Sequence, residues 1–318
     1  MSVVQTSPAV NRRPDDWPSV SAVVATRDRP DFLRRAVRSI VEQSYPGNVE
    51  CVVVFDQSAL ELPSIERMER RVLRAVTNER TPGLAGARNS GVLAATGELV
   101  AFCDDDDEWL PDKLRLQVRA LLRRGSHPAA TCGIYIQYDG RTIVRVPAIR
   151  EVTFGHLRRS RVMEAHPSTI VVPRAEFLGR IGPVDEAIPG SYAEDYEWLL
   201  RAAKIGPLVV VPRPLVKVRW HTSSWFGGRW PMIVAGLEYL LRKHPELRND
   251  PRGRARIYGQ IAFAQAASRN PRESRRWALR SIRSSWRERR AYIALAVSLG
   301  LIRAETVLRL AHARGRSI

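Results

Sequence analysis

No stretch of this sequence is long and apolar enough to cross a membrane as a helix, which requires about 20 predominantly apolar residues. The longest apolar run, Ala291 to Ile302, is short and has arginines on both sides, so we expect a core helix there. Residues 1–18 lack the apolar centre of a signal peptide, and we expect them to form a disordered leader. The sequence therefore predicts no membrane-spanning helix.

Cysteine is scarce, and the three cysteines of the chain are Cys51, Cys103 and Cys132. None has the close spacing to another cysteine or histidine that zinc sites show. Each lies in or beside an apolar run, so we expect small buried side chains in a reducing compartment. We therefore place the protein in the cytoplasm or at the inner face of the plasma membrane.

Acidic residues are outnumbered, with 33 Asp and Glu against 51 Lys and Arg, a formal net charge of +18. The excess is concentrated in residues 241–318, which contain 19 basic and 5 acidic residues. A basic surface suits nucleic acid, anionic lipid or a phosphorylated substrate, but charge alone indicates only non-specific association. We expect peripheral contact with an anionic membrane through this basic C-terminal region, and no specific nucleic-acid binding.

Apolar runs bounded by turn residues alternate with helical periodicity in the first half of the chain, which is the pattern of an α/β fold. A helix is predicted to begin at Pro30, since proline fits the first turn of a helix. The predicted strands of this half are residues 19–25, 50–55, 72–77 and 99–103. Because these strands are continuously apolar, we expect helices on both faces of their sheet.

The second half continues the α/β pattern as far as residue 221 and then becomes helical. We predict a helix at residues 193–203 and strands at residues 131–138, 142–146, 168–172, 208–211 and 215–218. From Arg229 onward the periodicity is helical throughout, with Pro245, Pro251 and Pro271 as breaks. The chain should therefore end in a group of packed helices.

Four consecutive aspartates, Asp104 to Asp107, follow the predicted strand 99–103 directly. Like charges this close raise one another's pKa and repel unless a cation lies among them. Carboxylate oxygens suit hard cations, and Mg²⁺ typically completes its coordination with substrate phosphates. Helix capping explains one or two of the aspartates but not four. The cluster therefore predicts a divalent metal that faces a phosphorylated ligand.

Two other polar motifs follow predicted strands, Thr26-Arg27-Asp28 after residues 19–25 and Asp56-Gln57-Ser58 after residues 50–55. Ligands of α/β sheets bind outside the carboxyl ends of the strands. We therefore expect these motifs and the aspartate cluster to lie at one edge of the sheet and to form one site.

Several sequence blocks, in this order, resemble the family-2 glycosyltransferases with the GT-A fold: residues 21–30, 52–58, 83–91, 97–109, 193–201 and 218–221. The resemblance covers about residues 19–245 and implies a Rossmann-like mixed sheet flanked by helices. It divides into a nucleotide-binding half, residues 19–128, and an acceptor-binding half, residues 129–245. The remaining residues 246–318 are expected to form a basic, all-helical extension.

The resemblance implies roles for the aspartate cluster and for one histidine. Asp104 and Asp106 correspond to the aspartate-x-aspartate pair of the family, with Asp106 expected to contact the metal and Asp104 the ribose or the metal shell. Asp105 is assigned to the same nucleotide site, and Asp107 to a supporting or capping position. His221 is a candidate metal ligand near the diphosphate, although a single histidine is often only a surface residue. The ion would be Mg²⁺ or Mn²⁺.

The same resemblance places a nucleoside against the first two strands. Asp56 matches a carboxylate near the nucleobase and would accept an N–H of uracil, thymine or guanine, which favours a UDP-, dTDP- or GDP-sugar. Thr26 and Asp28 are expected beside this nucleoside, and Arg27 beside phosphate. In the glycine-rich block, Arg88 offers a planar fork for phosphate and Asn89 lies next to it, although tight turns also need glycine.

Asp195 matches the carboxylate that faces the acceptor in this family, and we expect it to be the general base. Such a base removes the acceptor proton during a single displacement, with inversion at the anomeric carbon. Without the resemblance, Glu194 and Asp195 would be read as favourable partners of a helix dipole. Residues 225–230 resemble the signature of processive synthases, but Phe226 replaces its glutamine, so we expect transfer of one sugar.

The leading hypothesis is an inverting, metal-dependent, non-processive glycosyltransferase of the hexosyltransferase type. Its acceptor would be a saccharide or lipid-linked hydroxyl in cell-envelope polysaccharide or glycolipid biosynthesis. One alternative is a nucleotidyltransferase, which also combines an α/β sheet with acidic metal ligands. Another is a membrane- or nucleic-acid-binding protein that acts through its basic tail.

Overall fold

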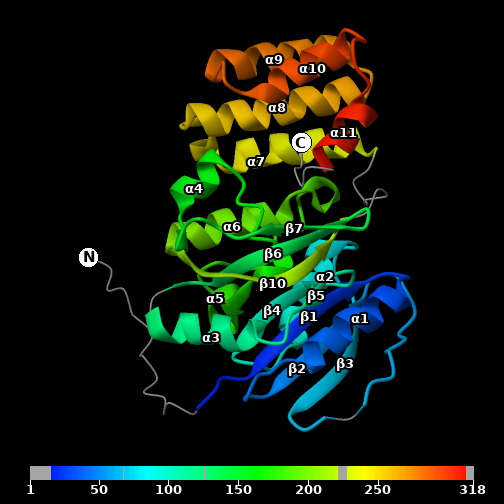
Figure 1. Cartoon of the computed structure of the whole chain (residues 1–318), viewed down its shortest axis with the longest axis vertical. Helices are drawn as coiled ribbons and strands as arrows, with labels where there is room; N and C mark the ends of the chain where they lie inside the picture. Colours follow the sequence, from blue (N-terminus) through cyan, green and yellow to red (C-terminus); the bar gives the residue numbers. More distant parts are fainter. Residues whose placement is uncertain (1–15, 67, 125–126, 221–227, 313–318) are drawn as a thin grey trace.

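The computed structural model describes residues 16–66, 68–124, 127–220 and 228–312. These residues form one mixed ten-stranded sheet with helices on both faces, and a group of C-terminal helices stacked beyond it (Figure 1). The strand order is β3-β2-β1-β4-β9-β6-β10-β5, with β7 paired to β6 and β8 paired to β10. The predicted α/β class with a helical extension is confirmed.

The first half of the sheet is parallel and consists of β1 (Val20–Thr26), β2 (Val49–Phe55), β3 (Arg71–Thr77) and β4 (Leu99–Asp104). Every residue of β1 and β2 is buried, as expected for strands covered on both faces. The edge strand β3 is different, because its residues are exposed or half-buried. Its position at the end of the sheet leaves one side without a neighbouring strand.

The second half contains β5 (Glu108–Trp109), β6 (Ala130–Tyr138), β7 (Arg141–Arg145), β8 (Glu151–Val152), β9 (Val171–Pro173) and β10 (Leu208–Arg219). The two strands predicted at residues 208–211 and 215–218 are one strand, β10, whose pairing with β6 shifts register around Pro214. Proline has no amide hydrogen for the ladder, so the sequence pattern breaks there although the strand continues. The strand predicted at 168–172 is mostly wrong, because Pro167–Thr169 form a 3-10 turn before β9.

Helices cover the two faces of the sheet in two separate cores. Side chains of α1 (Pro30–Val41) and α3 (Lys113–Arg124) pack on one face. Helices α2 (Leu84–Ala94), α5 (Arg174–Leu178) and α6 (Glu194–Ile205) pack on the other. The short α4 (Phe154–Arg159) lies beside α6 and buries Leu157. Helix α1 begins with Pro30 as predicted, and its apolar stripe, Leu33, Ala36, Val37 and Ile40, is buried.

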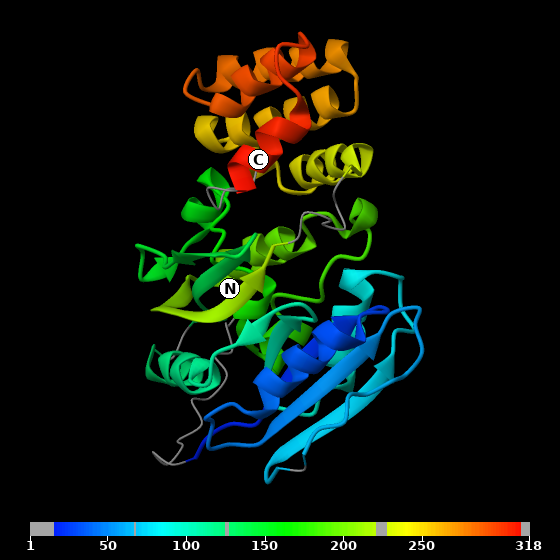
Figure 2. The same cartoon turned by 45° about the vertical axis from the view of Figure 1, so that its right-hand side comes forward.

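The C-terminal helices are α7 (Trp230–Lys243), α8 (Pro251–Ala267), α9 (Pro271–Ser284), α10 (Arg289–Ser298) and α11 (Ala304–His312), with a 3-10 turn at Pro245–Arg248. Each of the three predicted proline breaks is the first residue of one of these elements. Side chains of α7 and α8 belong to the same core as α2 and α6, so the helical extension packs directly onto the sheet-containing part (Figure 2).

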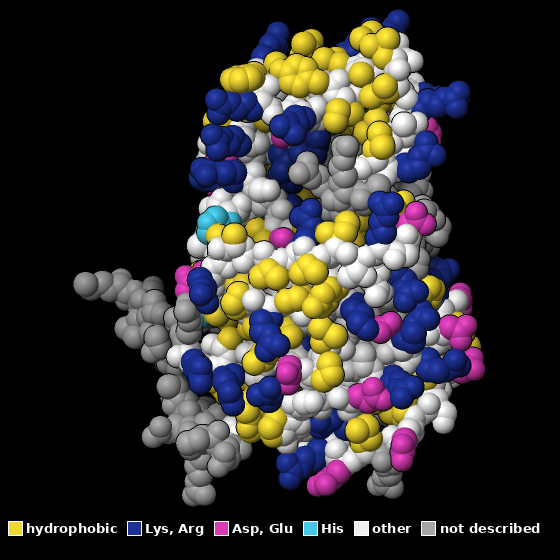
Figure 3. Space-filling model, viewed as in Figure 1, with side chains coloured by type: hydrophobic (Ala, Val, Ile, Leu, Met, Phe, Trp, Pro, Cys, Tyr) yellow, Lys and Arg dark blue, Asp and Glu magenta, His cyan; other side chains and the backbone are white. Residues whose placement is uncertain are grey.

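The run Ala291–Ile302 forms the predicted core helix only in its first part, where α10 buries Ala291 and Ala294. Helix α10 ends at Ser298, and Leu299 and Leu301 are 59% and 73% exposed. Hydrophobic side chains gather at the outer end of the C-terminal helices, with Lys and Arg around them (Figure 3). Within the described ranges, no helix combines the length and apolar character needed to cross a membrane.

The remaining expectations concern the N-terminus and the cysteines. Residues 1–15 of the expected leader lie outside the described residues, whereas Trp17 lies edge-on against Tyr45 with 5.3 Å between ring centroids. Cys51, Cys103 and Cys132 are buried and form no disulfide, as predicted.

Candidate functional site

The carboxyl ends of β1, β2 and β4 lie side by side. In the parallel register, Thr26 pairs with Phe55 of β2, and Ala25 pairs with Asp104 of β4. Asp56 follows Phe55 directly, so the three polar motifs predicted to share one edge of the sheet do so.

A cleft of about 770 Å³ opens at this edge, a volume typical of small-molecule sites. Four of the predicted site residues, Thr26, Arg27, Asp28 and Asp56, line it. Its other described lining residues come from the ends of β1 and β2, the start of α2, the segment before α6 and the start of α7: Ala25, Arg29, Gln57, Thr81–Ala87, Glu186, Ile188, Gly190, Ser191, Arg229 and Met232.

Two residues at the mouth of this cleft have unusual backbone conformations. Asp28 has φ 53° and Gln57 has φ 57°, in the left-handed region that residues other than glycine rarely adopt. Such conformations persist only where the surrounding structure holds them, and they cluster at ligand sites. Each of them lies two residues after the end of a strand and lines the cleft.

Asp56 is held in a fixed orientation at the cleft wall. One oxygen accepts a hydrogen bond from Asn78 Nδ2 at 2.7 Å, and the other accepts from the Gly83 N–H at 2.9 Å. Gly83 has φ +115° at the start of α2, a conformation that a side chain would strain. Gly86 is required for a different reason, because a Cβ there would lie 1.9 Å from the Thr81 carbonyl oxygen. The glycine-rich block is therefore shaped by packing as well as by the cleft.

Thr26 and Arg29 connect the cleft to the aspartate cluster. The Thr26 hydroxyl donates to Asp105 at 2.8 Å, and Arg29 forms ion pairs with Asp105 at 2.7 Å and with Asp106 at 3.0 Å. Burial raises the pKa of Asp105 to about 7, although Arg29 and Thr26 favour its ionised form. Asp105 is thus a buried support for the cleft wall, while Asp106 is 18% exposed beside it.

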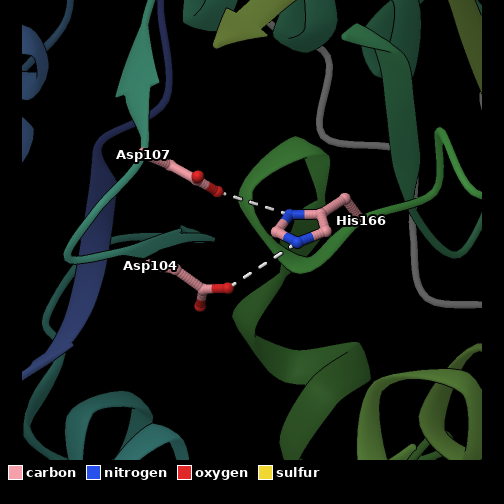
Figure 4. A group of neighbouring side chains, drawn as sticks. All are labelled: Asp104, Asp107 and His166. Atoms are coloured by element: carbon pink, nitrogen blue, oxygen red, sulfur yellow. Dashed lines mark ion pairs between the residues drawn. The ribbon is translucent and has the colours of Figure 1, made fainter. Parts of the chain in front are cut away.

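The described residues contain one group of side chains with metal-ligand geometry: Asp104, Asp107 and His166, whose candidate ligand atoms all lie within 4.8 Å of one another (Figure 4). His166 Nδ1 lies 3.4 Å from Asp107 Oδ2, and His166 Nε2 lies 3.8 Å from Asp104 Oδ2. Two carboxylates and an imidazole form a donor set that suits a divalent cation. The residues present therefore fit the metal that the aspartate cluster predicts.

The partners of Asp107 fix it in place. The Ser168 hydroxyl donates to it at 2.5 Å, and the Arg219 N–H donates at 3.1 Å. Burial, with Asp104 and Asp106 nearby, raises the pKa of Asp107 well above its usual range. Burial also lowers the pKa of His166, which favours the neutral imidazole that binds metals.

This group differs from the predicted pair, Asp106 and His221. His221 lies outside the described residues, and Asp106 pairs with Arg29. His166 was missed because its position depends on β9, which pairs antiparallel with β4 and so brings the segment before β9 to the carboxyl end of β4. The only sequence signal was a histidine directly before a predicted strand at residues 168–172.

Arg88 and Asn89 do not line the cleft, although Ala87 before them does. Arg88 is buried, and its guanidinium pairs with Asp104 at 2.7 Å and with Glu194. Burial works against its charge, but these carboxylates hold the pKa of Arg88 above its usual value. Asn89 donates to the Val184 carbonyl at 2.8 Å and to Glu186 at 2.6 Å. Asn89 therefore anchors the segment that leads to α6.

Asp195, the predicted base, lies in the first turn of α6, next to the same charge network. The preceding Ala193 has φ 64°, which turns the chain sharply into the helix. Arg161 Nη2 lies 2.5 Å from Asp195 Oδ2. Burial favours the neutral carboxyl, but Arg161, Arg88 and His166 together lower the pKa of Asp195. Burial raises the pKa of the adjacent Glu194 to about 7, with Asp195 adding to the effect.

The order along the site runs from Asp56 through the cleft to the aspartates, and from there through Arg88 to α6. Asp104 and Glu194 both pair with Arg88, so the metal-ligand group and the start of α6 share one buried cation. The arrangement can hold a phosphorylated ligand in the cleft, a cation at the aspartates and a carboxylate base beyond them.

A protein family and several known proteins resemble this chain in sequence. The family model described as "Glycosyl transferase family 2" matches residues 21–175. The "Amylovoran biosynthesis glycosyltransferase AmsB" of Erwinia amylovora is 30% identical over 229 residues, which cover 66% of this chain and 72% of that protein. The "UDP-Glc:alpha-D-GlcNAc-diphosphoundecaprenol beta-1,3-glucosyltransferase WfgD" of Escherichia coli is 31% identical over 149 residues, 46% of this chain and 57% of that protein.

Solved structures resemble the fold over nearly the whole chain. TarS 1-349 of S. aureus in complex with UDP-GlcNAc has a TM-score of 0.56 at 15% identity, and the match covers 94% of this chain and 92% of that one. The mannosyltransferase PcManGT from Pyrobaculum calidifontis, in complex with GDP-Man and Mn²⁺, has a TM-score of 0.53 at 17% identity, with 92% and 83% covered. At these identities the likeness concerns the fold.

Proposed function

This chain belongs to glycosyl transferase family 2 and is a glycosyltransferase with the GT-A fold, and from that premise we propose its reaction. The enzyme transfers one sugar from a nucleoside-diphosphate sugar to a hydroxyl of a cell-envelope saccharide or lipid-linked acceptor. Transfer depends on a divalent metal and inverts the anomeric carbon.

The observation that carries this proposal is the cleft at the ends of β1 and β2, continuous through Thr26 and Arg29 with the aspartate cluster. Asp56 and Asp28 at the cleft wall suit a nucleoside, and Arg27 suits its phosphates. The diphosphate then lies toward Asp104 and Asp106. UDP-, dTDP- and GDP-sugars are the candidate donors, in keeping with the UDP-sugar named for the Escherichia coli relative and the GDP-sugar bound to PcManGT.

Asp104, Asp106, Asp107 and His166 are the described residues that would hold the cation. A bound Mg²⁺ or Mn²⁺ supplies positive charge where negative charge develops on the departing diphosphate. Arg29 holds Asp106 and Asp105 on the cleft side, while Ser168 and the Arg219 N–H hold Asp107. These contacts keep the carboxylates in place before the ligand arrives.

Asp195 is the proposed general base and accepts the proton of the attacking hydroxyl, which leads to inversion in a single displacement. Its carboxylate is ionised, because Arg161 and Arg88 outweigh the effect of burial. It lines a small pocket with Arg88 and Pro167 and does not line the donor cleft. The acceptor therefore approaches between α6 and the segment that contains His166.

Two relatives favour a cell-envelope acceptor. One is named for amylovoran biosynthesis, and the other acts on a sugar linked to diphosphoundecaprenol. Peripheral contact with an anionic membrane fits this acceptor. The segments on either side of α10 expose Trp286 before the helix and Leu299 and Leu301 after it, and exposed apolar side chains on a basic extension favour contact with the interface of anionic bilayers.

The test is the melting temperature of the protein with UDP, GDP, dTDP or CDP, each with and without Mn²⁺. A ligand that binds the folded state raises the melting temperature. We expect one nucleoside diphosphate to stabilise the protein in a metal-dependent manner, and the matching nucleotide sugar to be consumed with release of that diphosphate. No stabilisation by any pair, or consumption of a nucleoside triphosphate with release of pyrophosphate, would overturn the proposal; the second result would indicate a nucleotidyltransferase.

A further inference from the structure

Three arginines from separate elements converge on two tyrosines where the helical extension meets the sheet-containing part. Arg161 follows α4, Arg256 lies in α8 and Arg290 lies in the first turn of α10. The Cζ atoms of Arg161 and Arg256 lie 5.9 and 5.4 Å from the ring centroid of Tyr196. All three guanidinium groups also act on Tyr192, the residue before the turn into α6, and oppose the effect of burial on its pKa.

The protein does not use all the hydrogen-bonding capacity of this cluster. Arg256 is only 7% exposed and donates to the Tyr196 hydroxyl at 2.9 Å and to Gln260 at 3.2 Å, but its Nε has no partner. Arg290 donates to Glu288 at 3.0 Å, and its buried Nε also lacks a partner. Buried donors without a partner are costly, so the two Nε atoms of this cluster are available to an acceptor of hydrogen bonds.

The cluster also carries more positive than negative charge. Asp195 pairs with Arg161 and Glu288 pairs with Arg290, whereas no carboxylate in the described part of the chain pairs with Arg256. Burial lowers the pKa of Arg256, and the charges of Arg290 and Arg161 lower it further. A buried cation beside two others is unfavourable unless an anion joins them.

Part of the cluster is open to solvent. The side chains of Arg161 and Arg290 are 36% and 30% exposed, so a ligand can reach both. Arg161 also contacts Asp195, the proposed base. An anionic group bound here would therefore sit beside the carboxylate that receives the acceptor proton.

We propose that Arg161, Arg256 and Arg290 form a binding site for a phosphate group of the acceptor. Planar guanidinium forks match phosphate oxygens in pairs, and three of them suit a phosphate or diphosphate. The site adjoins Asp195 through Arg161, and two of its three residues belong to the helical extension. This inference rests on the proposed function, because it names the chemical class of the acceptor for that reaction.

The first experiment measures binding of inorganic pyrophosphate by calorimetry in the presence of EDTA. We compare the full-length wild type with Arg290→Gln, and use Arg289→Gln as the matched control, since Arg289 is the exposed neighbour on the same helix. Loss of a charge-assisted contact should weaken binding about ten-fold or more in Arg290→Gln and leave Arg289→Gln unchanged. Arg161→Gln serves as a second variant if Arg290→Gln does not fold.

Equal affinity in wild type and Arg290→Gln, equal losses in both Arg290→Gln and Arg289→Gln, or no pyrophosphate binding by the wild type would overturn the site. Stabilisation by a nucleoside diphosphate with Mn²⁺ is measured on the same variants. It should be unchanged in Arg290→Gln, because the donor cleft does not include this residue. Failure of that stabilisation in every protein, including the wild type, would instead contradict the proposed function.

A second ligand distinguishes lipid-linked from water-soluble acceptors. Farnesyl diphosphate carries the same diphosphate on a short isoprenoid chain. Tighter binding of farnesyl diphosphate than of pyrophosphate, lost in Arg290→Gln, supports the site and assigns it to a lipid-linked acceptor. Equal binding of the two ligands, again lost in Arg290→Gln, supports the site for a water-soluble phosphorylated acceptor.

Discussion

Arg161 holds Asp195 through an ion pair of 2.5 Å between Nη2 and Oδ2, at the first turn of α6. This contact keeps the carboxylate ionised and oriented, and it ties α6 to the segment after α4. Asp195 and Arg161 therefore act together, one as the proposed base and the other as the group that positions it.

Asp195→Asn should lower the rate of sugar transfer about 10²- to 10⁴-fold, the usual contribution of a general base. Donor binding should be retained, because Asp195 does not line the donor cleft. Steady-state transfer rates and stabilisation by the nucleoside diphosphate check the two parts. Glu176→Gln is the control, because this carboxylate of α5 forms an ion pair with Arg180 and lies outside the donor cleft. Full activity in Asp195→Asn would remove this residue from the base role.

His166→Ala and Asp106→Ala distinguish between the two arrangements of metal ligands. If His166, Asp104 and Asp107 hold the ion, His166→Ala should weaken Mn²⁺ affinity at least about ten-fold, as losses around metal sites commonly do. If Asp106 contacts the ion directly, Asp106→Ala should have the larger effect. Titration of Mn²⁺ in the presence of the nucleoside diphosphate measures both. A role for His166 as a ligand fails if its variant binds Mn²⁺ like the wild type.

Lys113→Met should stabilise the protein at neutral pH. The Lys113 ammonium is fully buried 3.9 Å above the Trp109 ring and has no hydrogen-bond partner. Burial lowers the pKa of Lys113 to about 8, below the usual value for an exposed lysine. Folding therefore opposes protonation, and the cost, up to about 3 kcal/mol, is present below pH 8 and fades as the pH rises toward 10.5.

Urea unfolding of wild type and Lys113→Met at pH 7 and pH 10 checks the direction in which the stability difference changes with pH. The advantage of the methionine variant should be largest at pH 7 and smaller at pH 10. An advantage that grows with pH, or a methionine variant less stable than the wild type at pH 7, would show that the cation–ring contact outweighs burial of the charge.

Replacing Trp286 and Leu301 with serine should weaken binding to vesicles that contain an anionic phospholipid. Both side chains are exposed, at 67% and 73%, and burial of such a side chain in the bilayer interface contributes about 1–2 kcal/mol. The double variant should therefore lose roughly ten-fold or more in affinity in a vesicle flotation assay. Leu122→Ser, at a half-exposed leucine of α3, is the control. Equal flotation of all three proteins would exclude this surface as a membrane contact.

The sequence predicted correctly those structural features that depend on residues close together in the chain. The α/β sheet was predicted from its continuous apolar strands and from the proline at the start of α1. The edge that carries the cleft was predicted from the three polar motifs at strand ends. These features needed no long-range information.

The contacts of individual side chains between distant segments could not be predicted from the local sequence. Arg88 was expected to face phosphate, but in the structure its guanidinium pairs with Glu194, 106 residues away in the sequence. His166 approaches the aspartates only because the short β9 runs antiparallel to β4. Pro214 interrupted a pattern that belongs to one strand. Each of these depends on a pairing between distant segments that no local periodicity encodes.

The shared core of α6, α7 and α8 limits where the chains of two such enzymes can be joined to make a chimera. Leu240 of α7 and Ile257 and Ile261 of α8 are fully buried in the same core as Leu200 of α6. A chimera that joins residues 19–245 of this chain to the tail of another family member would open that interface and expose apolar surface. A functional exchange would have to keep the apolar surfaces of α6, α7 and α8 matched to one another across the junction. Directed evolution of a new acceptor preference should therefore treat the helical extension as part of the catalytic unit.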